Sequence, residues 1–402
     1  MTEAGRILLV GQSYGRGGAA TSRLFTELAE ALASADFVVE VLTSAGAAQA
    51  SSSQWEGGVL VHRVSVGLPG RRIPARLTLP LLWFQLVRWC LFTRRRYHQA
   101  ILLDTPYLLT LGGLFLCWRH GTRLIAWVMD RPLLQISRLR PEASPQARLA
   151  LGLNRLQMAL YRHCQLVVSL GECMAAALAA EGIPTARLRV IGTWEQDDLP
   201  TAALPAVSAR RICGLPEAFT VMYSGYAGAW HDFEPIFEAV VALAFNQDLQ
   251  FLFCGLGPGI ERIRVWAADH PKSRVLFREL VPPQQRVASL CCGDVHLVAL
   301  RASMAGTCCP SKLDALLGLS RPVIVVAPPH TQTARDVVET GAGVCAPTGR
   351  ELVAAIRALK EAPGFPEPWA RAAHQAFLVS HAASAVLPRW CALLEEPIQA
   401  AI

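Results

Sequence analysis

The 402-residue chain is longer than one hydrophobic core comfortably supports, so its length favours two domains. Hydrophobic residues make up 52% of it and charged residues 17%, which describes a globular protein, and no apolar run reaches the ~20 residues needed to span a bilayer. Lys and Arg outnumber Asp and Glu by 38 to 31, an excess too small to indicate nucleic-acid binding, although it suits an anionic ligand or membrane surface.

The first half of the sequence alternates buried strands with helical periodicity. An apolar run at 7–10 leads into the glycine-rich segment Gly15–Gly18, and helical spacing of leucines follows over 20–33. This order predicts a Rossmann-like opening, but G-x-G-x-x-G is absent, and a tight turn is the alternative explanation of the glycines. Further strands are expected at 37–43, 59–66, 101–104, 124–129, 166–170 and 190–192.

The second half repeats this alternation after 197–208, a proline-containing segment of little pattern in which we place the linker. Strands are expected at 219–224, 249–254, 275–277, 295–300 and 323–327, with helices at 233–244 and 260–268. Two such runs predict an α/β protein of two doubly wound Rossmann-like domains facing across a cleft, over residues 1–200 and 209–371. Residues 372–402 are expected to form a helix that crosses back to the first domain.

The segment Cys309–Leu313 carries the most suggestive local chemistry. Ser311 is suited to cap a helix at 314–319, because its hydroxyl can accept a bond from an early backbone N–H. The dipole of such a helix favours an anion at its start, and Lys312 adds a mobile positive charge. A phosphate-binding turn and an ordinary capped surface helix both fit these residues.

Residues 71–97 combine seven arginines with an apolar middle that contains Trp83, Phe84 and Trp89. Basic ends around an aromatic apolar centre are typical of a helix that lies at a membrane interface. A core helix with charged flanks is the alternative.

The twelve cysteines are scattered, and no signal peptide precedes them, so we expect reduced thiols in a cytosolic protein. Neither Cys-x-x-Cys nor a His/Cys cluster with zinc spacing occurs, and Asp-x-Asp is absent. We therefore expect no metal site.

Short motifs follow one another in a specific order along the chain. They lie at Gly17–Ala20, Gly57–Arg63, Val128–Asp130, Val167–Leu170, Val190–Trp194, Tyr223–Glu234, Phe253–Pro258, Asp294–Val298 and Pro310–Lys312. By their order and spacing the chain resembles the bacterial family 4 retaining glycosyltransferases of the two-domain GT-B fold. The most similar branch builds cell-surface polysaccharides and lipid-linked repeat units, and the resemblance covers nearly the whole chain.

The resemblance implies that the second domain binds a nucleotide-diphosphate sugar and the first binds the acceptor. The donor-binding residues that it implies are Arg16, Gly17, Gly18, Ser224, Gly225, Gly255, Gly257, Ser311, Lys312 and Leu313. Asp130 would contact the acceptor hydroxyl, while His231 and Lys312 would act at the leaving phosphate. The alternatives are that Asp130 caps a helix or pairs with Arg131, and that His231 caps the next helix. Preorganised N–H groups and cations would stabilise the leaving diphosphate without a metal or cofactor.

The sequence departs from the family pattern at several carboxylates. Ala305 and Ala315 stand where relatives often carry acidic residues around the donor helix, and Tyr226 replaces a usual Asn. One expectation is a transferase at the cytoplasmic membrane face, held there by 71–97, that acts on a polyprenyl-linked saccharide or another surface-glycan precursor. The other is a catalytically degenerate GT-B subunit that binds a partner transferase or a glycan.

Overall fold

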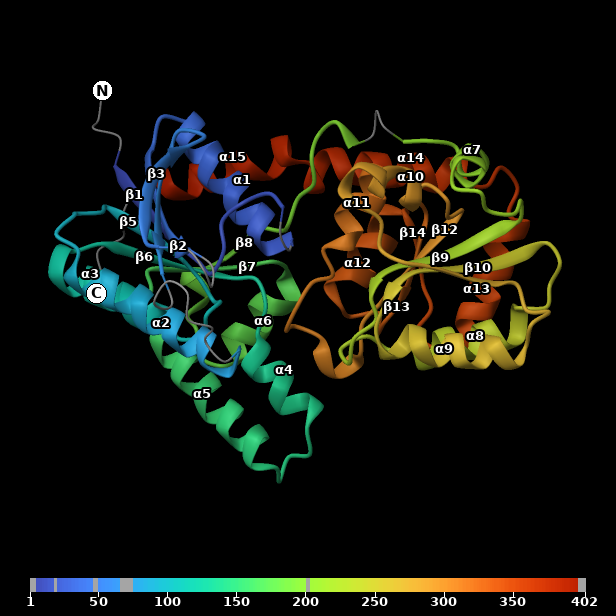
Figure 1. The fold of residues 1–402 in the computed structure, drawn as a ribbon, viewed down its shortest axis with the longest axis horizontal. Coiled ribbons are helices and arrows are strands. Elements are labelled where there is room, and N and C mark those ends of the chain that lie inside the picture. Colours follow the sequence, from blue (N-terminus) through green and yellow to red (C-terminus); the bar gives the residue numbers. More distant parts are fainter. Residues whose placement is uncertain (1–4, 18–19, 46–49, 66–74, 200–202, 397–402) are drawn as a thin grey trace. The chain divides into compact units, whose positions relative to one another are not determined.

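The chain divides into two compact units, each built on a mainly parallel sheet with helices on both faces (Figure 1). Unit 1 comprises Met1–Gly192 and Leu387–Ile402, and unit 2 comprises Thr193–Val386. The predicted α/β class with two Rossmann-like domains is confirmed. This computed structural model describes residues 5–17, 20–45, 50–65, 75–199 and 203–396.

The sheet of unit 1 has the strand order β3-β4-β2-β1-β5-β6-β7-β8, and all neighbours pair in parallel except β3 and β4. Every residue of β6 and β7 is buried, as expected for parallel strands covered on both faces. The strands are Arg6–Val10 (β1), Val38–Ser44 (β2), Ser52–Glu56 (β3), Val59–Val64 (β4), Gln99–Leu103 (β5), Arg123–Val128 (β6), Leu166–Ser169 (β7) and Leu188–Val190 (β8).

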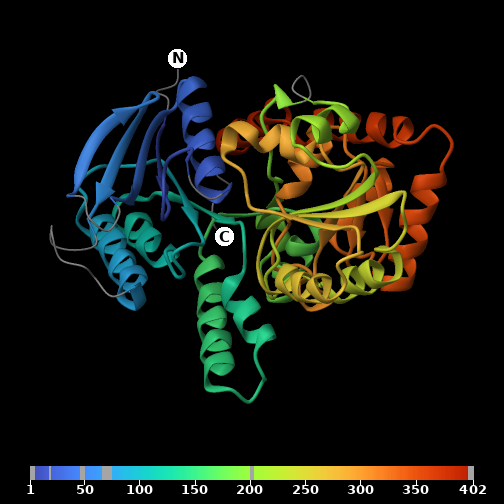
Figure 2. The same ribbon diagram turned by 45° about the vertical axis from the view of Figure 1, so that its right-hand side comes forward.

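Helices α2, α3 and α5 cover one face of this sheet, where Leu86, Leu116 and Met158 join the strand residue Leu102 in one hydrophobic cluster. The helices of the unit are Ala20–Ser34 (α1), Ala75–Phe92 (α2), Thr110–His120 (α3), Pro132–Leu139 (α4), Pro145–Tyr161 (α5), Glu172–Ala180 (α6) and the end of Ala383–Glu395 (α15). Helices α4 and α5 form a hairpin that projects from the rest of unit 1 (Figure 2).

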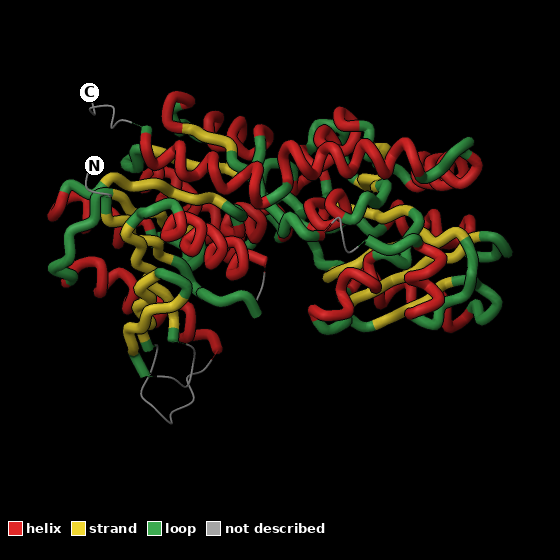
Figure 3. Tube along the Cα trace, turned by 90° about the horizontal axis from the view of Figure 1, so that it is seen from above, coloured by secondary structure: helices red, strands yellow, loops and turns green. Residues whose placement is uncertain are grey.

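Unit 2 has the strand order β11-β10-β9-β12-β13-β14, all parallel. Phe251 and Phe253 of β10 pack under α8, α9 and α13, whereas Leu252 and Cys254 belong to the core under α10, α11 and α14. The sheet thus lies between two helical layers (Figure 3).

The strands of unit 2 are Phe219–Tyr226 (β9), Leu249–Leu256 (β10), Val275–Arg278 (β11), Val295–Ala299 (β12), Val323–Val326 (β13) and Gly343–Cys345 (β14). Its helices are Ala206–Ile212 (α7), Glu234–Leu243 (α8), Pro258–Asp269 (α9), Arg286–Leu290 (α10), Lys312–Gly318 (α11), Gln332–Thr340 (α12), Gly349–Glu361 (α13) and Glu367–Ala376 (α14).

Two strands and one helix differ from the sequence-based prediction. Strand β3 is exposed and polar, and β14 has only three residues, so neither gives an apolar run to detect. The helix expected over 372–396 is interrupted by a π-helical turn at Phe377–His381 and by extended Ala382. The interruption follows from a tertiary pairing, because Glu195 N–H donates to His381 O and Ala383 N–H donates to Glu195 O.

Helix α2 has a buried face and an exposed face. Leu82, Leu86 and Cys90 enter the core, while Phe84 is 55% exposed. Trp89 is half-buried, and its ring centroid lies 5.3 Å from that of His62. Among the described residues, no helix is both long enough and apolar enough to cross a membrane.

Candidate active site

The carboxyl ends of β9 and β10 approach each other so closely that they exclude side chains. Gly255 pairs with Gly225 in the ladder, and their φ angles are +141° and +119°. A Cβ on Gly255 would lie 2.1 Å from the Gly225 carbonyl oxygen, and one on Gly257 would lie 2.7 Å from that of Ala227. Glycine alone fits there, and it leaves bare backbone at the edge of the sheet where α/β folds bind ligands.

Lys312, the first residue of α11, places its ammonium group beside this edge. Its Nζ is 3.9 Å from the centroid of the Tyr223 ring and 3.6 Å from where a Cβ on Gly225 would stand. The residue is half-buried along its length, but Nζ itself is buried and has no hydrogen-bond partner among the described residues. Burial lowers the pKa of Lys312 from 10.5 to about 7. A buried cation without a counter-charge is costly, so this position is suited to an anionic ligand.

His231 lies in the turn after β9, close enough to Lys312 to feel its charge. Its Nδ1 accepts a hydrogen bond from the Gly228 N–H at 3.1 Å, which leaves the ring proton on Nε2. Burial, and then the charge of Lys312, lower the pKa of His231 to about 3. The imidazole is therefore neutral at physiological pH and has one N–H to donate. The helix-cap alternative for His231 is wrong, because α8 has Phe233 at its N-cap and no side-chain cap bond.

Two residues of the Pro-Ser-Lys segment differ from expectation in their local structure. Helix α11 begins at Lys312, and Ser311 makes no side-chain cap bond, so the predicted hydroxyl cap is wrong. The backbone of Ser311 is helical (φ −63°, ψ −11°), whereas a capping hydroxyl usually sits on an extended residue. Leu313 is buried in the core, and its N–H already donates to Pro310 O at 3.2 Å. Its side chain therefore serves packing.

Asp314, two residues after Lys312, is held inside unit 2. Its carboxylate accepts a hydrogen bond from Thr193 Oγ1 at 2.6 Å and contacts His381 Nδ1 at 2.8 Å. Burial disfavours the charged imidazole, yet the Asp314 carboxylate outweighs it and raises the pKa of His381. These contacts tie α11 to the segments through which the chain enters and leaves unit 2, and they help to fix Lys312.

The glycine-rich loop after β1 is described as far as Gly17. Arg16 forms a salt bridge with Glu30 on α1, and the Gly15 N–H donates to Thr26 Oγ1 at 2.7 Å. A Cβ on Gly17 would meet no atom within 4 Å, so packing does not require glycine there. Gly18, also predicted to bind the donor, lies outside the described residues.

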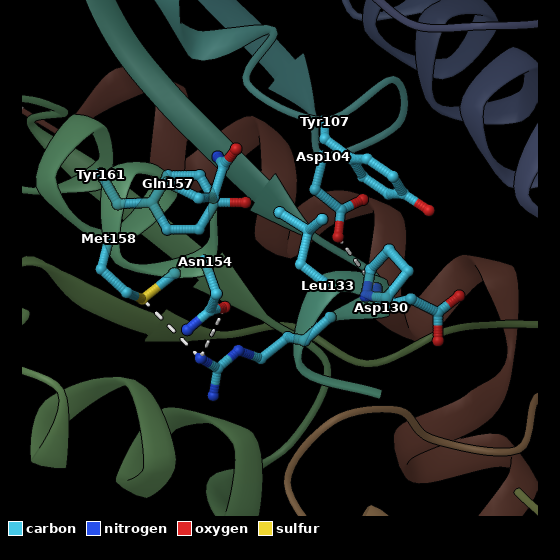
Figure 4. Close-up of a pocket in the computed structure, with 10 residues that line it drawn as sticks. Asp104, Tyr107, Asp130, Leu133, Asn154, Gln157, Met158 and Tyr161 are labelled. Atoms are coloured by element: carbon cyan, nitrogen blue, oxygen red, sulfur yellow. Dashed lines mark hydrogen bonds between the residues drawn. The ribbon is translucent and has the colours of Figure 1, made fainter. Parts of the chain in front are cut away.

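A small pocket, partly open to solvent, lies at the carboxyl ends of β5 and β6 (Figure 4). Asp104 directly follows β5 and accepts a hydrogen bond from the Asp130 N–H at 3.2 Å. Burial, reinforced by the charge of Asp130, raises the pKa of Asp104 well above 3.8.

The Asp130 carboxylate points away from Gln157 and Tyr161 (Figure 4). The many protein atoms around Asp130 raise the pKa of its carboxyl group. The residue is nevertheless exposed to water, which stabilises the carboxylate and opposes this shift. Both alternative roles of Asp130 are wrong, because α4 has Arg131 at its N-cap without a side-chain cap bond, and Arg131 donates to Glu181 at 2.5 Å.

The structure therefore gathers Gly225, His231 and Lys312, with Ser224 next to them in β9, in unit 2. It places Arg16 and Asp130 after two strands of unit 1. Sequence reasoning missed Tyr223, whose ring supports Lys312 but whose strand reads only as apolar. It also missed Asp104, whose signal was the same as that of Asp130, an acidic residue at the carboxyl end of a buried strand.

Comparison with known proteins shows the fold and finds one family similarity in the first half of the chain. Residues 17–194 match the family described as glycosyl transferase 4-like domain. Sucrose-phosphate synthase from Thermosynechococcus elongatus is 18% identical with a TM-score of 0.72, covering 98% of both chains. Anabaena HepE, solved in complex with UDP and glucose, is 15% identical with a TM-score of 0.66, covering 98% of this chain and 100% of its own.

WaaG, a glycosyltransferase involved in lipopolysaccharide biosynthesis, is 11% identical with a TM-score of 0.63, covering 97% of this chain and 100% of its own. No curated protein sequence matches the chain. At these identities the solved structures show the fold, and the family match is confined to residues 17–194. The chain thus has the two-domain GT-B fold of these solved structures, and its residues 17–194 match the glycosyl transferase 4-like domain.

Proposed function

We propose that the protein is a retaining, metal-independent glycosyltransferase. It moves a hexosyl or hexosaminyl group from a nucleotide-diphosphate donor to a lipid-linked saccharide or another surface-glycan precursor. The observation that supports this proposal is the Lys312 ammonium group, which is buried beside Gly225 and has no hydrogen-bond partner in the described part of the chain. A diphosphate is the ligand chemistry that supplies the missing negative charge at this position.

The residues around Lys312 suit departure of a nucleoside diphosphate. As the glycosyl–phosphate bond breaks, negative charge grows on the leaving oxygen, and Lys312 and the Nε2–H of His231 stabilise it. Losing one such contact typically costs about 2.7–4 kcal/mol of transition-state stabilisation. The bare backbone at Gly225, Gly255 and Gly257 lets the nucleotide approach closely. Because protein cations meet the charge of the diphosphate, no metal bridge is needed.

Asp130 is the proposed contact to the acceptor hydroxyl. It is exposed after the carboxyl end of β6 and lines the pocket that also contains Asp104. Helix α2 is the proposed membrane contact, because Leu77, Phe84 and Arg88 are exposed on it. This contact would hold the protein on the inner face of the cell membrane, where a lipid-linked acceptor is presented.

The alternative function is a non-catalytic GT-B subunit, and the state of Asp314 favours it. The carboxylate nearest to Lys312 in sequence is bound by Thr193 and His381, so it is not available to orient a sugar. Nucleotide-sugar turnover separates the two functions: slow hydrolysis of a nucleotide-sugar by the purified protein supports the enzyme, and absence of any nucleotide binding supports the subunit.

The direct test is a thermal-shift titration with uridine, guanosine and thymidine diphosphates. A diphosphate at 100 times its Kd is expected to stabilise the protein by about 2.7 kcal/mol. Lys312→Met should abolish this shift. Lys272→Met is the matched control, because Lys272 is an exposed lysine of the same unit. If a diphosphate raises the melting temperature of wild type and Lys312→Met equally, Lys312 does not bind the donor.

A further inference from the structure

The α4–α5 hairpin has an interior that packs and an outer end that does not. Leu133 and Leu134 of α4 and Met158 and Tyr161 of α5 are buried where the hairpin joins unit 1. Beyond them the two helices extend away from the sheet, with the connecting residues 140–144 farthest from it (Figures 1 and 2). The outer end is therefore presented to the surroundings on several sides.

Apolar and basic side chains share the outward face of α5. Arg148, Leu149, Gly152, Arg155 and Leu156 follow helical spacing and are all exposed. The exposed fraction is 66% for Leu149 and 48% for Leu156. On α4, Ile136 and Leu139 are also exposed, next to exposed Arg138 and Arg140.

The charge of this surface is mainly positive. Residues 132–161 contain four arginines and a single acidic residue, Glu142. Among the described residues, neither Arg148 nor Arg155 forms an ion pair with a carboxylate; Arg148 donates to Ala143 O at 3.0 Å. No carboxylate of the described residues therefore neutralises these two arginines.

Leucines flanked by arginines match an anionic lipid surface. The leucines can enter the boundary between headgroups and acyl chains, while the arginine heads reach the phosphates. A symmetric contact between two copies of the chain fits less well, because it would bring the same arginines of both copies together.

We propose that the α4–α5 hairpin is a membrane-binding arm that inserts Leu149 and Leu156 into an anionic leaflet. The inference rests on the proposed function in one respect, the presence of a lipid-linked acceptor. The inner part of the hairpin supplies Pro132, Leu133 and Met158 to the pocket that contains Asp104. Insertion of the outer end holds this pocket near the headgroups, where the linked saccharide begins.

The test is flotation of the full-length protein with phosphatidylcholine vesicles, with and without phosphatidylglycerol. The variants are Leu149→Ser/Leu156→Ser and Arg148→Gln/Arg155→Gln. The control is Ile212→Ser/Val265→Ser, which removes two equally exposed apolar side chains from unit 2. A fourth variant, Phe84→Ser/Phe92→Ser, reports on α2.

Wild type and control are expected to float with the anionic vesicles. Each hairpin variant should lose about tenfold or more in its partition coefficient. In the arginine variant the loss arises because each arginine near an anionic surface raises the partition coefficient about fivefold. In the leucine variant it arises because two apolar side chains no longer leave water. The arm is overturned if both hairpin variants float like wild type, if wild type binds neutral vesicles equally well, or if wild type does not float. It is also overturned if the hairpin replacements instead abolish a dimer seen by light scattering.

Thermal shifts with the nucleoside diphosphates keep the two proposals separate. The hairpin variants should keep the wild-type melting temperature and the wild-type shift, because the replaced side chains are exposed and lie in unit 1. A protein that floats as expected but binds no nucleotide would contradict the proposed function and still support the membrane-binding arm.

Discussion

Replacing Lys312 by methionine is expected to stabilise the unliganded protein and at the same time to remove its affinity for nucleoside diphosphates. Methionine has a similar length and no charge, so it can lie over the Tyr223 ring without a buried ammonium group. The folded state would no longer hold a charge for which the described chain supplies no partner. Binding and stability should therefore change in opposite directions.

The pKa of Lys312 sets the size of the effect. A fall from 10.5 to about 7 corresponds, at about 1.4 kcal/mol per pH unit, to an upper bound of about 4–5 kcal/mol. Methionine also loses the attraction between the cation and the ring, worth about 0.5–2 kcal/mol. We expect a net gain of about 2–4 kcal/mol in the free energy of unfolding near neutral pH.

The gain depends on pH with a definite sign. The unfolded chain binds the Lys312 proton up to pH 10.5, whereas the folded chain releases it near pH 7. Wild-type stability should therefore rise as the pH increases from about 7 to 10.5, and the advantage of Lys312→Met should shrink over the same range. Below pH 7 the advantage should be constant.

Urea unfolding of wild type, Lys312→Met and the exposed control Lys272→Met, at several values between about pH 6 and pH 10, measures both quantities. The control should match wild type throughout. The reasoning fails if Lys312→Met is less stable than wild type, or if its advantage does not change with pH, because either result means that the ammonium group is not buried without compensation.

Three further results are expected. Gly255→Ala should lower the free energy of unfolding by about 3 kcal/mol or more, because its Cβ would meet the Gly225 carbonyl in a strained backbone. Gly152→Ala, in open space on α5, should instead raise the free energy of unfolding by about 0.5–1 kcal/mol. Urea unfolding measures both variants, and similar effects of the two would contradict the close approach of β9 and β10. Affinity for a nucleoside diphosphate should fall up to about tenfold per pH unit above pH 7, since binding requires protonated Lys312. His231 is neutral between pH 5 and 8, so it adds no pH dependence there. Calorimetry that finds constant affinity above pH 7 would count against Lys312. Sugar transfer should continue at the same rate in a metal chelator, and a loss that manganese or magnesium restores would show that the diphosphate needs a metal.

Much of the fold could be predicted because its signals are local. Parallel strands buried on both faces are typically near-continuous apolar runs, and β13 and all but the first residue of β6 are such runs. Strand β3 could not be found in this way, because it is a polar edge strand whose pairing with β4 is decided by the hairpin. The break at Ala382 was equally invisible, since it depends on a hydrogen-bonded bridge to Glu195.

The candidate site likewise combines features set by the local sequence with features set by tertiary contacts. Sequence by itself determined that Gly225, Gly255, His231 and Lys312 belong to motifs at the carboxyl ends of strands or the start of a helix, because glycine positions and helix starts are set by nearby residues. Only the tertiary structure decided that the Lys312 ammonium is buried against Tyr223 and that the Asp314 carboxylate is hydrogen-bonded to Thr193 and His381. Burial and pairing depend on side chains brought together from distant parts of the chain, and the chemistry of a cation or a carboxylate follows from those neighbours rather than from its own position in the sequence.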